Sequence, residues 1–104
     1  MQFALQLFAL LASFCSFVLA DLHSRGICVD LLDIDGYELY NEDASKQACE
    51  WYLARNTGTE QWDQCPDCYF STDPVPHCRS DGWHIGGDEL YYYCQLAGAD
   101  ASAA

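Results

Sequence analysis

Apolar and polar positions after residue 20 follow two different periods, and the change of period divides the chain into elements. Residues 26–32 (GICVDLL) are apolar and β-branched, which predicts a strand. Asp35-Gly36 and then YELYN follow, a pattern typical of a β-hairpin with a two-residue turn. In that register Leu32 faces Leu39, and the face expected to be buried carries Cys28, Leu32, Ile34, Tyr37 and Leu39.

A helical period replaces the strand pattern near residue 43. Asp43 or Ser45 can cap a helix that runs to about Asn56, and Gly58 is a suitable terminator. The apolar stripe of this predicted helix consists of Ala48, Cys49, Tyr52 and Leu53.

A second helix is predicted close to the C-terminus. Asp88 and Glu89 suit a helix N-terminus, where the backbone dipole favours negative charge, and Gly98 suits the end. The alternative is a strand, because LYYYC is rich in residues that favour sheets. The terminal signals favour the helix, whose stripe consists of Leu90, Tyr93, Cys94 and Ala97.

The segment between the two helices, 59–83, contains all three prolines and predicts turns rather than long elements. Two short strands, 68–70 and 77–79, are expected around the sequence STDPVP. Residues 21–26 are expected to form a flexible lead and 99–104 a disordered tail. The fold class predicted is α+β: a small disulfide-rich domain with a β-hairpin, a central helix and a short C-terminal helix.

The N-terminal segment 1–20 has the pattern of a cleavable signal peptide. Its apolar run ends on Val18 and Ala20, which suit the −3 and −1 positions of a cleavage site, and Asp21 follows. The alternative is a membrane anchor, which the missing basic flank disfavours. We therefore expect a signal peptide at 1–20, a disulfide-stapled domain at 21–98 and a secreted, extracellular protein.

Cysteine content supports export. Cys15 leaves with the signal peptide, and an even set of six remains in a chain too small to be stable on apolar burial alone. Six cysteines allow 15 connectivities, and the sequence does not choose among them. Proximity arguments alone suggest the pairs Cys28–Cys94, Cys49–Cys65 and Cys68–Cys78.

Charge narrows the possible partners. Lys and Arg number 4 against 16 Asp and Glu, a net charge of −12, and all of these residues follow residue 20. Such a surface repels nucleic acids and anionic membranes, so neither is expected as a partner. The charge is explained either by solubility or by electrostatic steering toward a basic partner.

Three candidate chemical sites have simpler explanations. Cys65-Pro-Asp-Cys68 is a C-x-x-C motif, but it lacks a thioredoxin-like context and its neighbouring aspartates disfavour a thiolate. Zinc binding by these cysteines with histidines (His23, His77 and His84) matches ligand spacing only loosely. A calcium loop built on Asp33, Asp35 and Glu42 would place Leu31 at its first ligand position. We expect no cofactor and no metal, and without a catalytic motif we expect no enzyme.

Aromatic side chains are the most suggestive candidates for recognition. Three consecutive tyrosines on a helix point in directions about 100° apart, so Tyr91 or Tyr92 is expected at the surface. Exposed tryptophan and tyrosine commonly anchor protein contacts, although packing in the core is the alternative for each residue. The candidate binding surface consists of Trp62, Trp83, Tyr91 and Tyr92.

Two stretches, ACEWYLARNTGTEQWDQCPDC at 48–68 and HIGGDELYYYC at 84–94, resemble small secreted cysteine-rich proteins of plant-associated fungi, of the biotrophy-associated secreted type. The resemblance implies a fungal virulence effector that is secreted during host colonisation, with an apoplastic destination. The expected function is non-enzymatic binding of a host or extracellular protein or a cell-wall component, by a monomer. The alternatives are a protease inhibitor or toxin-like protein, and a small secreted hydrolase or redox protein.

Overall fold

The computed structural model describes residues 22–32 and 36–104. Its element order is β1 (Leu22–His23), β2 (Arg25–Leu31), β3 (Glu38–Tyr40), α2 (Glu42–Leu53), β4 (Tyr69–Ser71), β5 (His77–Arg79), β6 (Ile85–Gly86), α3 (Gly87–Leu96) and β7 (Ala101–Ala103). The fold class is α+β with antiparallel strands, as predicted. The predicted signal peptide and the turn residues 33–35 lie outside the described residues.

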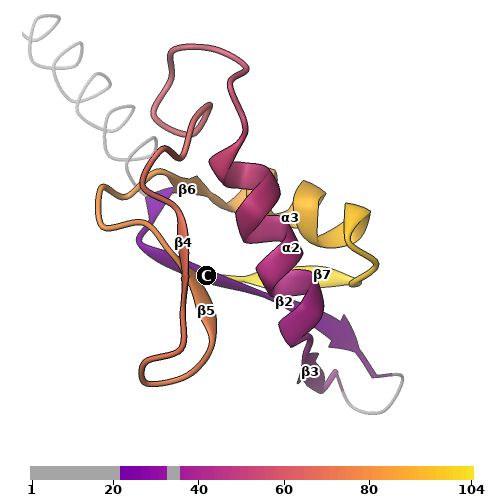
Figure 1. Ribbon diagram of the computed structural model, residues 1–104. Helices are drawn as coiled ribbons and strands as arrows, with labels where there is room; N and C mark the ends of the chain where they lie inside the picture. The colour runs from indigo at the N-terminus through magenta and orange to yellow at the C-terminus, as the bar shows by residue number, and fades with distance from the viewer. Residues whose placement is uncertain (1–21, 33–35) are drawn as a thin grey trace, which may run out of the picture.

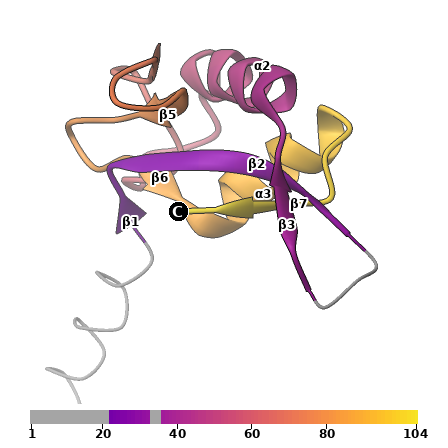
Figure 2. The ribbon, with the colours of Figure 1, turned by 90° about the horizontal axis from the view of Figure 1, so that it is seen from below.

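Strand β2 is the centre of the main sheet. It pairs with β3, β5 and β7, and β4 extends the sheet beyond β5, while β1 and β6 form a separate two-stranded sheet. Helices α2 and α3 pack beside each other against β2, which runs the length of the fold (Figures 1 and 2). Gly26 allows the close approach of α3, because a Cβ at this position would collide with the Leu90 side chain.

Helix α2 begins at Glu42, one residue before the earlier of the two predicted caps. Asn41 is the N-cap, and its side-chain oxygen accepts a hydrogen bond from the Ala44 amide at 3.0 Å. Ser45, the other predicted cap, is buried: its hydroxyl accepts from the Cys28 amide at 2.7 Å and donates to the Asn41 carbonyl at 2.7 Å. The side chain therefore fixes α2 to β2 instead of capping it.

The β2–β3 hairpin differs from the predicted register by two residues. Val29 pairs with Tyr40 and Leu31 with Glu38, so Leu32 faces Tyr37 rather than Leu39. The connection is longer than an Asp-Gly turn, and Gly36 with a φ of 70° is its last residue. Of the face expected to be buried, Cys28 is buried and Ile34 lies outside the described residues. The prediction is wrong for Leu32, Tyr37 and Leu39, which are exposed where the hairpin extends beyond the helices (Figure 2).

The two segments expected to lack structure are ordered. Leu22–His23 forms β1 against β6, and Ala101–Ala103 forms β7, which pairs with Ile27 to Val29 of β2. Ala99 is buried, and the Asp100 amide donates to the Val29 carbonyl at 3.1 Å. The prediction of a disordered tail at 99–104 is wrong, because small residues with weak sheet propensity complete the ladder of the central strand.

Sulfur makes up much of the hydrophobic core. All six cysteines after Cys15 are buried, and the largest fully buried apolar side chains among the described residues are Tyr52, Ile85, Leu90 and Val29. So small a set of large side chains matches a fold whose stability depends on covalent links as well as on apolar burial.

Candidate functional site: the sulfur cluster and the exposed apolar surfaces

Two disulfides link the helices to the sheet, and a third closes a turn. Cys28 of β2 is bonded to Cys94 of α3, the pair suggested by the sequence, and Cys49 of α2 is bonded to Cys78 of β5. Cys65 and Cys68 are bonded to each other in the turn that precedes β4.

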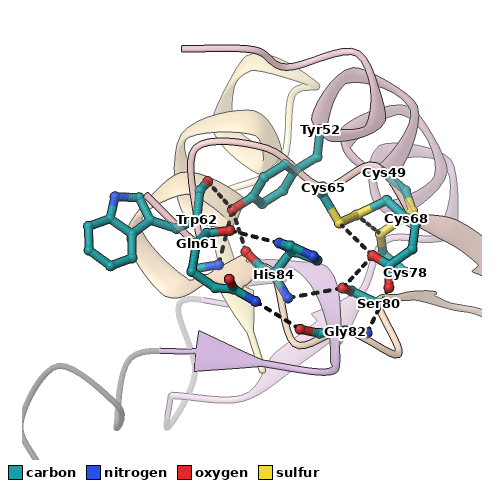
Figure 3. The surroundings of a disulfide bond; sticks show 12 residues. Cys49, Tyr52, Gln61, Trp62, Cys65, Cys68, Cys78, Ser80, Gly82 and His84 are labelled. Carbon is teal, nitrogen blue, oxygen red and sulfur yellow. Dashed lines mark hydrogen bonds between the residues drawn. A yellow bond between two sulfur atoms is a disulfide. The ribbon is translucent and has the colours of Figure 1, made fainter. Parts of the chain in front are cut away.

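The other two expected pairs, Cys49–Cys65 and Cys68–Cys78, are therefore wrong. The reason is geometric, because the four cysteines meet in one cluster (Figure 3). Cys68 Sγ lies only 3.9 Å from Cys78 Sγ, but α2 packs on β5 and brings Cys49 to Cys78. The turn that joins the Cys68 amide to the Cys65 carbonyl places these two Cα atoms 5.2 Å apart, within bridging distance.

The cluster has the dimensions of a metal site but not its chemistry. The sulfur atoms of Cys49, Cys68 and Cys78 all lie within 4.8 Å of one another. Zinc binds thiolates, and a sulfur atom in a disulfide has no negative charge to offer. Asp67 Oδ1, 3.7 Å from Cys65 Sγ, adds a negative charge that would make a thiolate at Cys65 less favourable.

Asp67 holds the 80–84 loop against the sulfur cluster. Its Oδ1 accepts from the Ser80 hydroxyl and its Oδ2 from the Gly82 amide, both at 2.7 Å (Figure 3). Partial burial acts to raise the pKa of Asp67, but these two hydrogen bonds and the nearby His84 lower it further than burial raises it. The net effect is a pKa below the usual aspartate value, so the carboxylate is the form that the fold favours.

Tyr52 holds a second loop. Its buried hydroxyl lies 2.7 Å from the Trp62 carbonyl and 3.0 Å from the His84 carbonyl, and it accepts a hydrogen bond from the Gly86 amide at 3.1 Å. Desolvation by burial raises the pKa of Tyr52 to about 12, so the hydroxyl keeps its proton as a donor. One phenol thus joins the end of α2 to the Trp62 loop, to the residue before β6 and to the last residue of β6.

The predicted aromatic surface is distributed over three parts of the fold. Trp62 is half-buried, with its Cβ above Gly86, whereas Trp83 is 56% exposed and has a left-handed φ of 58°. Their loops are joined by the Gln61 side chain, which donates to the Gly82 carbonyl at 2.9 Å. Tyr91 and Tyr92 are exposed on α3, and Tyr92 packs edge-on against Tyr93. The structure therefore brings together the loops of the two tryptophans, and separately the two tyrosines.

The densest group of exposed apolar residues along the described chain was not predicted from the sequence. Between residues 31 and 40, which span the β2–β3 hairpin, five of the described residues are large and apolar and have exposed side chains. We call this set the hairpin surface; it consists of Leu31, Leu32, Tyr37, Leu39 and Tyr40. The sequence carried a signal for it, because adjacent Leu31 and Leu32 must point to opposite faces, and a domain this small has no layer to cover both.

No helix of the described residues is long and apolar enough to cross a membrane.

Comparison with known proteins identifies the family. Neither a curated protein nor a solved structure matches the chain. A family model, described as Biotrophy-associated secreted protein 4, matches residues 21–103, which is most of the chain and begins directly after the predicted signal peptide. The family is one of secreted proteins, in agreement with the resemblance found at 48–68 and 84–94. On this match, the chain belongs to the Biotrophy-associated secreted protein 4 (BAS4) family.

Proposed function

We propose that the protein acts outside the producing cell, without catalysis, by binding a host or other extracellular protein through the hairpin surface. The main observation behind the proposal is the exposure of Tyr37 (66%), Leu39 (54%) and Leu32 (48%). These residues lie on a hairpin that extends from the disulfide-bonded part of the domain. These three side chains share one face of the hairpin, because Leu32 lies opposite Tyr37 and alternate residues of β3 point to the same side. An exposed apolar patch on a soluble protein marks a site of interaction. Membership of a biotrophy-associated family is consistent with a partner in the host.

The hairpin is held in place before a partner binds. The Leu32 amide donates to the Tyr37 carbonyl at 3.0 Å, and the Tyr40 hydroxyl donates to the Pro76 carbonyl at 2.7 Å, which ties β3 to the β4–β5 turn. Asn41 reaches Asp30 on the neighbouring strand with its side-chain amide. Because the surface is ordered in advance, less conformational entropy is lost on association.

Charge selects the kind of partner. Asp30, Glu38 and Glu42 lie on or next to the hairpin, and the whole chain carries a net charge of −12. A second copy of the chain and acidic polymers are repelled, whereas a basic protein with an apolar patch is attracted and desolvates the leucines and tyrosines. The proposal is therefore a basic extracellular protein.

The test uses the oxidised protein and one matched pair of variants. The folded protein is immobilised, extracellular fluid from colonised plant tissue is passed over it, and the retained protein is purified so that its Kd can be measured. The hairpin variant carries Leu32→Ser, Tyr37→Ser and Leu39→Ser. The control variant carries Trp83→Ser, Tyr91→Ser and Tyr92→Ser, the same number of exposed apolar residues on other surfaces.

We expect the hairpin variant to bind at least about 30-fold more weakly, because central apolar anchors contribute roughly 2 kcal/mol or more. The control variant should bind within about threefold of the parent. Binding that survives in the hairpin variant and disappears in the control would move the site to the aromatic residues of α3 and the 83 loop. An equal loss of affinity in both variants would contradict the proposed binding site. Chemical conversion of the partner by less than one equivalent of the protein would contradict a function without catalysis.

A further inference from the structure

The two disulfides of the sulfur cluster lie next to each other. Cys68 Sγ is 3.9 Å from Cys78 Sγ, although each of these atoms is bonded to a different cysteine. The sulfur atoms of Cys49, Cys68 and Cys78 all lie within 4.8 Å of one another (Figure 3), a set to which Cys65 does not belong. Thiol–disulfide exchange begins when a thiolate attacks a disulfide sulfur. A thiolate formed at Cys68 therefore lies beside a second bond that it can attack.

The Cys65–Cys68 bond closes the shorter loop of the two. It joins positions 3 apart, in a connection between α2 and β4 that contains no helix or strand, and Pro66 inside this loop is exposed. Cys49 and Cys78 lie 29 positions apart, on a helix and a strand that pack together. All four cysteines are buried in the folded protein, so a small thiol can reach the cluster only when a segment opens locally. The irregular 65–68 turn has the least structure to lose, and we expect its bond to open first.

Asp67 favours one direction of opening. Its Oδ1 lies 3.7 Å from Cys65 Sγ, and its negative charge makes a thiolate at Cys65 less favourable. In thiol–disulfide exchange, the thiol that ionises more easily leaves faster. An incoming thiolate therefore bonds to Cys65. Cys68, whose sulfur is the one next to Cys78, leaves as the thiolate.

We propose that the four cysteines form a disulfide relay, which passes a reductive opening of the Cys65–Cys68 bond on to Cys49. A low-molecular-weight thiolate forms a bond to Cys65 and displaces the Cys68 thiolate. The Cys68 thiolate then bonds to Cys78 and displaces Cys49, which takes up a proton. Each step forms one S–S bond and breaks one, so the external thiol ends as a mixed disulfide on Cys65 and no other oxidant or reductant is needed.

The relay changes what holds α2. Cys49 is the only cysteine of this helix, so its release removes the covalent link between α2 and β5. The new bond joins Cys68 to Cys78, which are 10 positions apart and lie within the β4–β5 region. A reducing environment thus frees the helix from its disulfide while the sheet keeps one. The proposal does not depend on binding through the hairpin surface.

The first test treats the oxidised parent protein with increasing concentrations of 2-mercaptoethanol, an uncharged thiol, at a mildly alkaline pH where part of it is thiolate. Free thiols are trapped with N-ethylmaleimide, and peptides are mapped by mass spectrometry without reduction. In the first product we expect mercaptoethanol on Cys65, a bond between Cys68 and Cys78, and maleimide on Cys49. The adduct and the free thiol then lie on residues that were not bonded to each other, which simple reduction of one disulfide does not produce.

A matched pair of variants tests the exchange step without an external thiol. Cys65→Ser leaves the free thiol on Cys68, so the Cys68–Cys78 bond should form and part or all of the Cys49–Cys78 bond should be lost. Cys68→Ser leaves the free thiol on Cys65, outside the set of neighbouring sulfur atoms, and should keep the Cys49–Cys78 bond alone. Both variants remove one cysteine of the same pair, so they differ only in which sulfur is free.

The proposal is overturned if the parent product carries maleimide on Cys68, because the opening then stays at the turn. It also fails if Cys49–Cys78 or Cys28–Cys94 is the first bond to react with the thiol, or if none reacts before the protein unfolds. A Cys65→Ser variant that contains only the Cys49–Cys78 bond contradicts the exchange step. If Cys65→Ser does not fold, the position of the maleimide in the parent still decides.

Discussion

At the scale of single residues, a few buried polar atoms hold the irregular part of the chain. Tyr52 and Asp67 each hold loop segments that have little regular structure of their own. Asp67 Oδ1 lies 3.7 Å from Cys65 Sγ, and Tyr52 belongs to the same buried cluster as the cysteines, so covalent and hydrogen-bonded links act on the same region. Their individual contributions to stability can be separated by conservative substitutions.

Tyr52→Phe removes only the hydroxyl that joins Trp62, His84 and Gly86. The Gly86 amide then loses its acceptor in a buried position, so we expect the free energy of unfolding to fall by about 1–3 kcal/mol. Urea unfolding followed by tryptophan fluorescence measures the change. Tyr69→Phe, which removes an exposed hydroxyl, is the control and should change the value by less than about 0.5 kcal/mol. Equal stability of Tyr52→Phe and the parent would contradict the role given to this hydroxyl.

Asp67 predicts a pH dependence of stability. Its pKa in the folded state is lower than the value of 3.8 that it has when exposed, so the unfolded chain binds more protons in the window between the two values. The stabilisation by Asp67 is fully present above about pH 4 and is lost as the pH falls through its lowered pKa. The difference in unfolding free energy between the parent and Asp67→Asn should be largest near pH 6 and should shrink below about pH 3. An Asp67→Asn difference that stays constant between the two pH values would refute the link.

At the scale of elements, the disulfides differ in the length of chain that they close. Cys28–Cys94 links positions 66 residues apart, Cys49–Cys78 positions 29 apart and Cys65–Cys68 positions 3 apart. Replacing both cysteines of a pair with alanine should cost about 4, about 3.5 and less than about 2 kcal/mol respectively, because longer closed loops restrict the unfolded chain more. Urea unfolding of the three double variants gives the order. A Cys65/Cys68 variant as unstable as the Cys28/Cys94 variant would show that native packing, not loop closure, determines these values.

Local signals were sufficient for the helices and for two of the short strands. The positions of α2, α3 and the β4–β5 pair follow to within a few residues from apolar stripes, terminal signals and the STDPVP turn, although Asn41 rather than Asp43 or Ser45 caps α2. Elements that depend on distant partners were not accessible in this way. Strand β7 exists because Ala101–Ala103 meets β2, and no property of the segment itself favours a strand.

The candidate surfaces show the same division. Helix geometry, which is local, predicted that Tyr91 or Tyr92 is exposed, and both are. The hairpin surface did not follow, since its exposure depends on where the layers of the domain end. The pairings within the four-cysteine cluster could not be read from the sequence either, because helix packing selects between sulfur atoms only 3.9 Å apart.

At the scale of the whole molecule, charge and exposed apolar surface oppose each other. The hairpin surface favours association, whereas 16 acidic residues against 4 basic ones make every copy repel every other. The repulsion acts over the whole molecule, but the attraction is confined to a few side chains. We therefore expect the protein to remain monomeric at neutral pH despite the exposed apolar side chains of the hairpin.

Bringing the net charge close to zero should therefore allow copies of the protein to associate through the hairpin surface. Near pH 4.1, the isoelectric point of the sequence, the net charge approaches zero and we expect the parent to self-associate, whereas at pH 7 it should be a monomer. Size-exclusion chromatography with light scattering, at equal protein concentration, measures the mass at both pH values.

The Leu32→Ser, Tyr37→Ser, Leu39→Ser variant should remain monomeric at both pH values, because the attractive side chains are gone. The Trp83→Ser, Tyr91→Ser, Tyr92→Ser variant loses as many exposed apolar residues and should still associate at the acidic value. If the two variants associate to the same extent, association is a general consequence of low net charge. The hairpin is then not the preferred contact surface.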